Sequence, residues 1–164
     1  MKLVKPNEKY FEELKKLKQE FYINKETRIQ GSGSLEKYEN LSEWLKSIKE
    51  IEKGLNSIVV QTEYYLGVVD NEVVGTICIR KGMNEEIEKF AGHIGYSVRP
   101  TKRNMGFGTK MLSLLLEKNI SQEVLIMAEK KNIASNKVIK NNNGLLLETI
   151  ALNNLVINKY IIKK

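Results

Sequence analysis

The sequence predicts one α/β domain built on a mixed sheet, and three observations lead to this fold class. Its 164 residues suit one domain better than two. Apolar residues between 7 and 54 recur with helical spacing, whereas 57–80 is rich in the residue types of strands. Residues 93–128 read as a strand, a helix and a strand. Because such a crossover joins parallel strands, those at 93–98 and 123–128 should lie parallel.

The N-terminal third predicts a short strand followed by two helices. Residues 2–5 form the strand. Asn7 can cap the first helix, whose apolar positions are Tyr10, Phe11, Leu14, Leu17 and Phe21. After a loop at 29–35, the second helix runs from Leu35 to a stop at Gly54. Its apolar side comprises Leu35, Tyr38, Leu41, Trp44, Leu45, Ile48 and Ile51.

The middle of the chain predicts a hairpin and then a further strand. Asp70-Asn71 is a two-residue turn between strands at 57–69 and 72–80. A polar connection at 81–92 leads to the strand at 93–98.

The C-terminal part predicts two helices and three strands. The first helix has one apolar side, made of Met111, Leu112, Leu115 and Leu116. The apolar stretch 123–128 predicts a strand buried on both faces beside a parallel neighbour. A short helix at 132–141 precedes a terminal hairpin, whose strands at 145–152 and 155–162 meet at Asn153-Asn154.

The composition argues against several classes of function. Lys and Arg number 27 against 20 Asp and Glu, but these basic residues are spread along the chain and form no nucleic-acid-binding tail. One cysteine, Cys78, and one histidine, His93, make neither a disulfide framework nor a closed zinc site, so we expect no structural metal. The sequence shows no signal peptide and no run of about 20 apolar residues. We therefore expect a cytoplasmic protein without a membrane partner.

Two glycines open the helix that follows the strand at 93–98. Unpaired N–H groups and a partial positive charge make a helix mouth an anion site. Gly106 and Gly108 leave room for a phosphate to approach the backbone, and Asn104 tolerates a left-handed conformation. Basic residues lie just upstream, at Arg99, Lys102 and Arg103. The stretch is either a pyrophosphate cradle or a tight strand-to-helix turn, since it matches neither the phosphate-loop nor the dinucleotide-binding pattern.

The stretch RNMGFGT at 103–109 resembles the acyl-CoA signature of the GNAT superfamily of N-acetyltransferases, Arg/Gln-x-x-Gly-x-Gly/Ala. A second stretch, NIASNKVIKNNNG at 132–144, resembles the Asn-x-x-Ser element downstream of that signature, with Asn132 and Ser135 in the named positions. The order of elements agrees, and the chain looks similar to uncharacterised predicted acetyltransferases of bacteria. The resemblance implies that residues 1–164 form one acyl-CoA N-acyltransferase domain of α/β (α+β) class. Its sheet would be mixed, mostly antiparallel and twisted, with a splayed parallel strand pair and helices on both faces.

The resemblance implies that acetyl-CoA is the co-substrate. Its pantetheine arm would enter the splayed slot beside the backbone of 97–99, and its pyrophosphate would rest on the turn at 103–109. Asn132 would contact the pantetheine or orient its helix, although it is equally well placed as a simple N-cap. The implied cofactor-binding residues are Ser97, Val98, Arg99, Arg103, Asn104, Met105, Gly106, Phe107, Gly108, Thr109, Asn132 and Ser135.

The resemblance also implies direct acetyl transfer to a primary amine of a small molecule, peptide or protein. A neutral amine attacks the thioester carbonyl, a backbone N–H stabilises the oxyanion, and CoA thiolate leaves. Ile139 stands where many relatives have the tyrosine that protonates the thiolate. The catalytic candidates are His93, whose ordinary pKa lies near neutrality, and Tyr96; structural roles are open for both.

Two alternatives and several open points accompany this reading. Ile139 keeps open a non-catalytic domain that senses acyl-CoA, and the net charge of +7 keeps open a nucleic-acid-binding protein, although we expect no nucleic-acid partner. The loop at 31–35 and the connection at 81–91 are candidate walls for the acceptor. In that connection, three carboxylates either recognise a cationic amine or are simply solvated, namely Glu85, Glu86 and Glu88. An exposed edge of the terminal hairpin would allow a homodimer.

Overall fold

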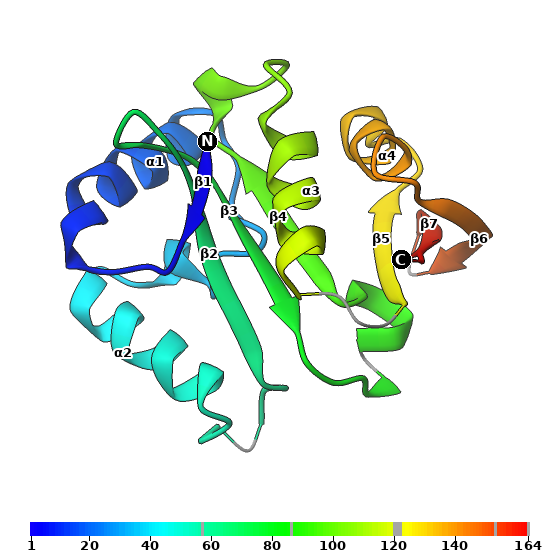
Figure 1. Ribbon diagram of the computed structural model, residues 1–164, viewed down its shortest axis with the longest axis horizontal. Helices are drawn as coiled ribbons and strands as arrows, with labels where there is room; N and C mark the ends of the chain where they lie inside the picture. Colours follow the sequence, from blue (N-terminus) through cyan, green and yellow to red (C-terminus); the bar gives the residue numbers. More distant parts are fainter. Residues whose placement is uncertain (57, 86, 120–122, 153, 164) are drawn as a thin grey trace.

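The computed structural model describes residues 1–56, 58–85, 87–119, 123–152 and 154–163 (Figure 1). The strands are β1 (Lys2–Val4), β2 (Thr62–Val69), β3 (Glu72–Arg80), β4 (Ile94–Val98), β5 (Val124–Glu129), β6 (Leu145–Leu152) and β7 (Leu155–Ile162). The α-helices are α1 (Phe11–Ile23), α2 (Leu41–Glu52), α3 (Phe107–Asn119) and α4 (Ile133–Lys140). Short 3-10 turns cover Glu8–Tyr10, Leu35–Lys37 and Pro100–Lys102, and a π-helical turn covers Ile87–Ala91.

The strands form two antiparallel sheets that stand side by side. One has the order β1-β2-β3-β4 and the other β5-β7-β6. In Figure 1, β4 and β5 run in the same direction at the boundary between the sheets. No ladder joins them over the part of the chain that the structure describes; just before β4, one isolated bridge of antiparallel type links Gly92 to Ile126, and His93 bonds Leu125. The splayed pair is thus confirmed, and the sheet is divided by a gap at this point.

Helices cover both faces of the first sheet, as the resemblance implied. Alternate residues of β2 point to opposite sides, because the side-chain period of a strand is two. Tyr64, Leu66 and Val68 pack into one buried cluster with α1 and α2. Tyr65 belongs to a second cluster, with Met111, Leu112 and Leu115 of α3 and the inner residues of β5 and β7. No helix in the described ranges is both long and apolar enough to cross a membrane.

Two turns confirm local predictions. Asn7 caps the first helical segment, where its side chain accepts a hydrogen bond from Lys9 N at 3.1 Å. Asp70 and Asn71 have φ values of +47° and +67°, the backbone that a two-residue hairpin requires at both central positions.

The second helix begins later than predicted. Leu35 starts only a 3-10 turn, Tyr38 is extended, and α2 begins at Leu41. The reason is Asn40, whose side-chain oxygen accepts from Ser42 N at 2.8 Å and from Glu43 N at 3.4 Å and so caps the helix. Leu35 is nevertheless buried.

Two predicted strands also need correction. The strand predicted from residue 57 starts only at Thr62, as β2. Residues 58–61 lie outside it, and residue 57 is not among the described residues. β5 is buried on one face and half-buried on the other. Its inner face packs against α3, whereas Met127 and Glu129 on its other face border the gap. Its neighbour is β7, which runs antiparallel to it.

Candidate active site

A cavity of about 1250 Å³ occupies the gap between the two sheets. Its walls are β4, the turn that leads into α3, the end of β5, the first turns of α4 and the segment 26–30. Most of the site residues suggested by the sequence therefore line this cavity, together with several residues that the sequence did not suggest.

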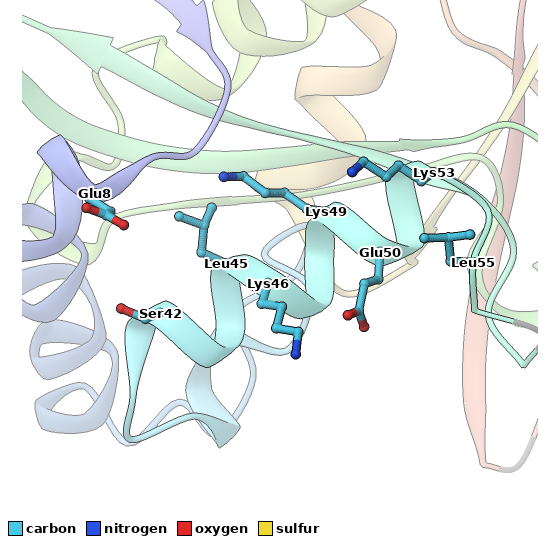
Figure 2. A pocket seen from close by; sticks show the side chains of 8 residues that line it. All are labelled: Glu8, Ser42, Leu45, Lys46, Lys49, Glu50, Lys53 and Leu55. Atoms are coloured by element: carbon cyan, nitrogen blue, oxygen red, sulfur yellow. The ribbon is translucent and has the colours of Figure 1, made fainter.

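A smaller hollow of about 420 Å³ lies on the outer side of α2 (Figure 2). Its walls carry three lysines from successive turns of the helix together with Glu8 and Glu50. Ser42 brings the start of α2 to this hollow, but Asn40 Oδ1 already caps the N–H of Ser42, and no strand lines the hollow among the described residues, so the larger cavity is the candidate site.

The turn into α3 presents the mouth of the helix to the cavity. Asn104 and Gly106 have φ values of +63° and +79°, which turns the chain sharply at two nearby points. The N–H of Lys110 donates to Gly106 O at 3.0 Å and makes the first hydrogen bond of the helix. The N–H groups of 106–109 thus precede the intrahelical ladder and point out of its end. A Cβ added to Gly106 would meet nothing within 4 Å, so the space beside Gly106 is open.

Gly108 is needed for a different reason. A Cβ at this position would lie 3.2 Å from Val138 Cγ2, 3.4 Å from Val98 Cγ2 and 3.8 Å from Tyr96 Cε2. A side chain here would push β4 and α4 away from the start of α3. Gly106 therefore permits the turn, and Gly108 permits close packing around the cavity.

The edge of β4 that faces the gap has no strand beside it in the described residues, and of its carbonyls Val98 O accepts from Arg103 Nε. Arg99 N donates to Val74 O at 2.9 Å, and Arg80 N donates to His93 O at 2.8 Å, so the odd-numbered residues are bonded to β3. Because consecutive residues of a strand alternate, the backbone groups of Tyr96 and Val98 point towards β5. No strand in the described residues pairs with this edge. Val98 and Ser97 both line the cavity.

Arg99 does not line the cavity. Its side chain is 7% exposed, and it pairs with Glu13 at 3.0 Å, Glu20 at 2.6 Å and Glu72 at 3.3 Å. These partners lie on α1 and β3, so Arg99 fixes α1 against the sheet. Met105 also lies outside the walls and is exposed to solvent.

Arg103 lines the cavity but its charge is already neutralised. It makes a bidentate pair with Glu26, with distances of 2.7 Å from Nη1 and 2.9 Å from Nη2, and its Nε donates to Val98 O at 3.2 Å. Hydrogen bonds from Arg103 hold the pKa of the Glu26 carboxyl below its ordinary value. The arginine thereby ties the end of β4 to the segment after α1.

Tyr96 and Ser135 are brought together across the gap. The Tyr96 hydroxyl donates to Ser135 Oγ at 3.0 Å and lies 3.3 Å from Ser135 O. Burial raises the pKa of Tyr96 to about 12, so the hydroxyl keeps its proton at neutral pH. Asn132 lines the cavity and caps α4, since its Oδ1 accepts from Ser135 N at 3.0 Å. The sequence suggested each of these three residues, but not their mutual contacts.

A buried polar network beneath α4 was not predicted. The Tyr160 hydroxyl donates to Asn136 Oδ1 at 2.6 Å, and Asn158 Nδ2 donates to the same oxygen at 2.7 Å. Asn136 Nδ2 in turn donates to Glu129 O at 2.8 Å. The network joins α4 to β5 and β7 and so fixes one wall of the cavity.

His93 lies outside the described walls of the cavity. Its ring Nδ1 accepts a hydrogen bond from Leu125 N at 2.9 Å, and its backbone N–H donates to Leu125 O at 2.7 Å. Burial lowers the pKa of His93 below its ordinary value, which favours the neutral ring. The residue serves as a link between the two sheets at the closed end of the gap.

Ile139 and Cys78 are both buried in the core. Ile139 packs with α3, so no side chain from this position of α4 reaches the cavity. Burial raises the pKa of the Cys78 thiol, which agrees with a small core residue rather than a nucleophile.

The two segments predicted as acceptor walls contribute little to the cavity, since Ala91 is the one described residue of 81–91 that lines it. The loop at 31–35 packs beneath β4, where Gly31 lies against Gly95, and the cavity wall is instead formed by Glu26, Arg28 and Gln30 just before it. Glu85 and Glu88 do not line the cavity, and Glu86 lies outside the described residues. Arg80 and Glu129 line it at the ends of β3 and β5. No sequence signal marked these residues, because only the pairing register of the strands and the path of the loop bring them to the cavity.

Comparisons with known proteins agree with this arrangement. The model of the acetyltransferase (GNAT) family matches residues 11–142. Among solved structures, the chain resembles the Salmonella typhimurium acetyl transferase that modifies the N-terminal serine of ribosomal protein L7/L12, with 19% identity and a TM-score of 0.66 over 98% of this chain and 92% of that one. No curated protein sequence matches the chain.

Two further structures share the fold. The microcin C7 self-immunity acetyltransferase MccE, solved with acetyl-CoA and AMP, has 17% identity and a TM-score of 0.69 over 98% of this chain and 90% of that one. Mycobacterium smegmatis RimJ, solved with a CoA disulfide, has 12% identity and a TM-score of 0.72 over 98% and 80%. At these identities the structures establish a common fold, and the family match covers most of the chain. The chain belongs to the acetyltransferase (GNAT) family.

Proposed function

We propose that this protein is an acetyl-CoA-dependent N-acetyltransferase that moves an acetyl group directly to a primary amine of a small molecule, peptide or protein. The observation that carries the proposal is the gap between β4 and β5, which opens beside the mouth of α3. Membership of the family and the acetyl-CoA bound in MccE support it.

The residues that line the gap fit the parts of acetyl-CoA. The pyrophosphate would rest on the N–H groups of 106–109, where positive partial charge and open space coincide. The backbone groups of Tyr96 and Val98 would bond the amides of the pantetheine arm, as a neighbouring strand would. Lys137, which is exposed on α4, faces the same cavity and suits the remaining phosphate.

The transfer requires one bond to form and one to break. The amine nitrogen attacks the thioester carbon, the carbon–sulfur bond breaks, and the CoA thiolate takes a proton. We assign this proton to the hydroxyl of Tyr96, which is held by Ser135 and is protonated at neutral pH. The proton of the attacking ammonium leaves to water or to Glu129. Of the two carboxylates in the described wall, Glu129 is the one that no arginine holds.

The first test is a thermal-shift titration with acetyl-CoA and CoA, with ATP as an anionic control. Ligand at about 100 times its dissociation constant stabilises by about 2.7 kcal/mol, or roughly 5–10 °C for a domain of this size. A saturable shift with acetyl-CoA and CoA but not with ATP supports the proposal. The absence of a shift at millimolar acetyl-CoA refutes it.

The second test is release of free CoA with a panel of amines. Replacement of Tyr96 by Phe should lower kcat by about 10²–10⁴-fold and leave the acetyl-CoA dissociation constant within a few-fold. Equal kcat values for the variant and the natural protein would remove Tyr96 from the mechanism.

The burial of Ile139 favours one alternative, a domain that binds acyl-CoA without catalysis. This alternative predicts the same thermal shift but no CoA release with any amine. Turnover above the rate without enzyme would exclude it.

We also propose that the protein forms a homodimer through the terminal hairpin. β6 lies at the edge of its sheet, and Leu145, Leu146 and Leu147 are 59%, 52% and 55% exposed. Sedimentation velocity should give a dimer, and replacement of Leu146 by Glu should give a monomer. A monomer for the natural protein at 100 μM, a concentration on the order of that used for structural work, would contradict this proposal.

A further inference from the structure

The two faces of the gap have different chemistry. Tyr96 points to the face covered by α3 and α4, where its hydroxyl meets Ser135. A side chain at Gly95 would point to the other face. A Cβ added there would lie 3.5 Å from Cys78 Sγ and 3.3 Å from Gly31 N. The first face holds the helix mouth and suits the cofactor. The acceptor is therefore left with the second face, which is bounded by the segment before Gly31 and by the end of β3.

Arg28 lies in that segment and lines the cavity. It is exposed, and no hydrogen bond or ion pair joins it to any residue in the described part of the chain. Its neighbour Gln30 is anchored, since Gln30 O accepts from Thr76 Oγ1 at 3.0 Å. Arg28 is thus an uncompensated charge beside a fixed section of backbone.

Arg80 approaches the same face from β3. It lies on the same face of β3 as Cys78, which pairs with Gly95. The N–H of Arg80 donates to His93 O, and His93 precedes Gly95 by two residues, or about 7 Å along an extended chain. Arg80 Nη1 donates to Gly92 O at 2.9 Å, which fixes the guanidinium, and no described residue engages its other donors.

The carboxylates of the cavity do not neutralise these two arginines. In the described wall, Glu26 is held by Arg103 and Glu129 pairs with Lys131 at 3.1 Å. Of the other basic side chains there, Lys102 pairs with Glu72 at 2.7 Å and Lys137 belongs to the cofactor face. Arg28 and Arg80 therefore give the acceptor face a net positive charge.

We propose that the acceptor is a primary amine that carries an anionic group, a carboxylate or a phosphate, which Arg28 and Arg80 bind. This inference rests on the proposed function, and it names the chemical class of the second substrate. A guanidinium binds either group through paired N–H donors. A cationic acceptor such as a polyamine would meet two arginines and no available carboxylate apart from Glu129.

The test compares amines that differ only in the anionic group, with the natural protein, acetyl-CoA and a free-thiol assay. The pairs are glycine with glycinamide, phosphoethanolamine with ethanolamine, and two peptides with Glu or Gln at the second position. At least one pair should show a kcat/KM about tenfold or more higher for the anionic member, the value of one charge-assisted hydrogen bond. The pair that responds distinguishes carboxylate, phosphate and acidic peptide.

Replacement of Arg28 by Gln should raise the KM of the anionic member about tenfold and leave the neutral member within twofold. Replacement of Lys25 by Gln is the matched control, because Lys25 is an exposed base near Arg28 that does not line the cavity. An equal or higher kcat/KM for the neutral members, or an unchanged ratio in R28Q, would overturn the inference.

Calorimetry in the presence of CoA separates this inference from the proposed function. Anionic amines should bind about tenfold more tightly than their neutral partners, whether or not acetyl transfer follows. Equal binding refutes the anionic acceptor. Absence of the acetyl-CoA thermal shift refutes the acetyltransferase instead.

Discussion

Replacement of Arg99 by Met tests whether the buried charge cluster holds α1 to the sheet. Methionine fills much of the arginine volume but removes the partner of two carboxylates, Glu13 and Glu20, whose side chains are only 19% and 20% exposed. Removal of one partner from a buried pair costs about 3–5 kcal/mol, because the remaining charges stay desolvated. Glu72 is 38% exposed and adds little. For a domain of this size, the expected fall in Tm is about 6–20 °C.

The assay is thermal and urea unfolding from pH 7 to pH 3.5. Although burial raises the pKa of both carboxyls, hydrogen bonds from Lys16 and Arg99 to Glu13, and from Thr101 and Arg99 to Glu20, lower both pKa values below the ordinary 4.5. A lowered pKa stabilises the folded state above the ordinary value, and this stabilisation is lost as the pH falls through the folded-state pKa. The difference between the natural protein and R99M should therefore be greatest at neutral pH and shrink below pH 4.5.

Two controls sharpen this test. Lys16 pairs with Glu13 at 2.8 Å on the surface, so replacement of Lys16 by Met should produce only a small fraction of the loss. Replacement of both glutamates by Gln in the R99M background should restore part of the stability, because no buried charge is left unpaired. A loss in R99M below about 1 kcal/mol, or one independent of pH, would refute the reasoning.

Three further predictions address the turn, the thiol and the network under α4. Replacement of Gly106 by Ala should destabilise by about 1–2 kcal/mol because its φ is +79°, although the added Cβ meets no atom; an unchanged urea midpoint would contradict this. Cys78 is buried and its thiol pKa is raised, so Ellman's reagent at pH 8 should label it only after unfolding, and rapid labelling of the native protein would disprove its burial. Replacement of Tyr160 by Phe removes one of the two donors to Asn136 Oδ1 and leaves Asn158 Nδ2, so it should cost about 0.5–1.5 kcal/mol in denaturant unfolding, whereas the exposed Tyr22→Phe should have no effect.

The sequence was most informative where structure is determined by neighbours in the chain. Asp70-Asn71 needed only its own backbone preference to make a hairpin turn, and Asn132 needed only the N–H of Ser135 to cap α4. The apolar spacing of α3 identified Met111 and Leu112 as core for the same reason.

The features that were missed depend on residues far apart in the sequence. Arg99 meets Glu13 and Glu20 only because α1 packs on β3, and nothing near Arg99 distinguishes a buried ion from a phosphate ligand. The half-exposed face of β5 follows from the gap beside it, which periodicity does not encode. Tyr96 and Ser135 required the same gap to meet. The glycine turn and Asn132 were therefore visible in the sequence, whereas the part of the cavity wall formed by Arg28, Arg80 and Glu129 emerged only from the fold.

The division of the sheet has a consequence for how the molecule opens. Between the two sheets the described backbone is joined mainly at one end, through the bonds of His93 to Leu125 at 2.7 Å and 2.9 Å. The buried cluster around α3 still joins the two sheets, but no ladder connects β5–β7 to β1–β4 in the described residues, so we expect the amides of β5–β7 to exchange with deuterium sooner. A ligand laid along the open edge of β4 would act as the absent strand. Occupancy of the gap would then slow exchange most in β5 and β7, well away from the atoms it touches.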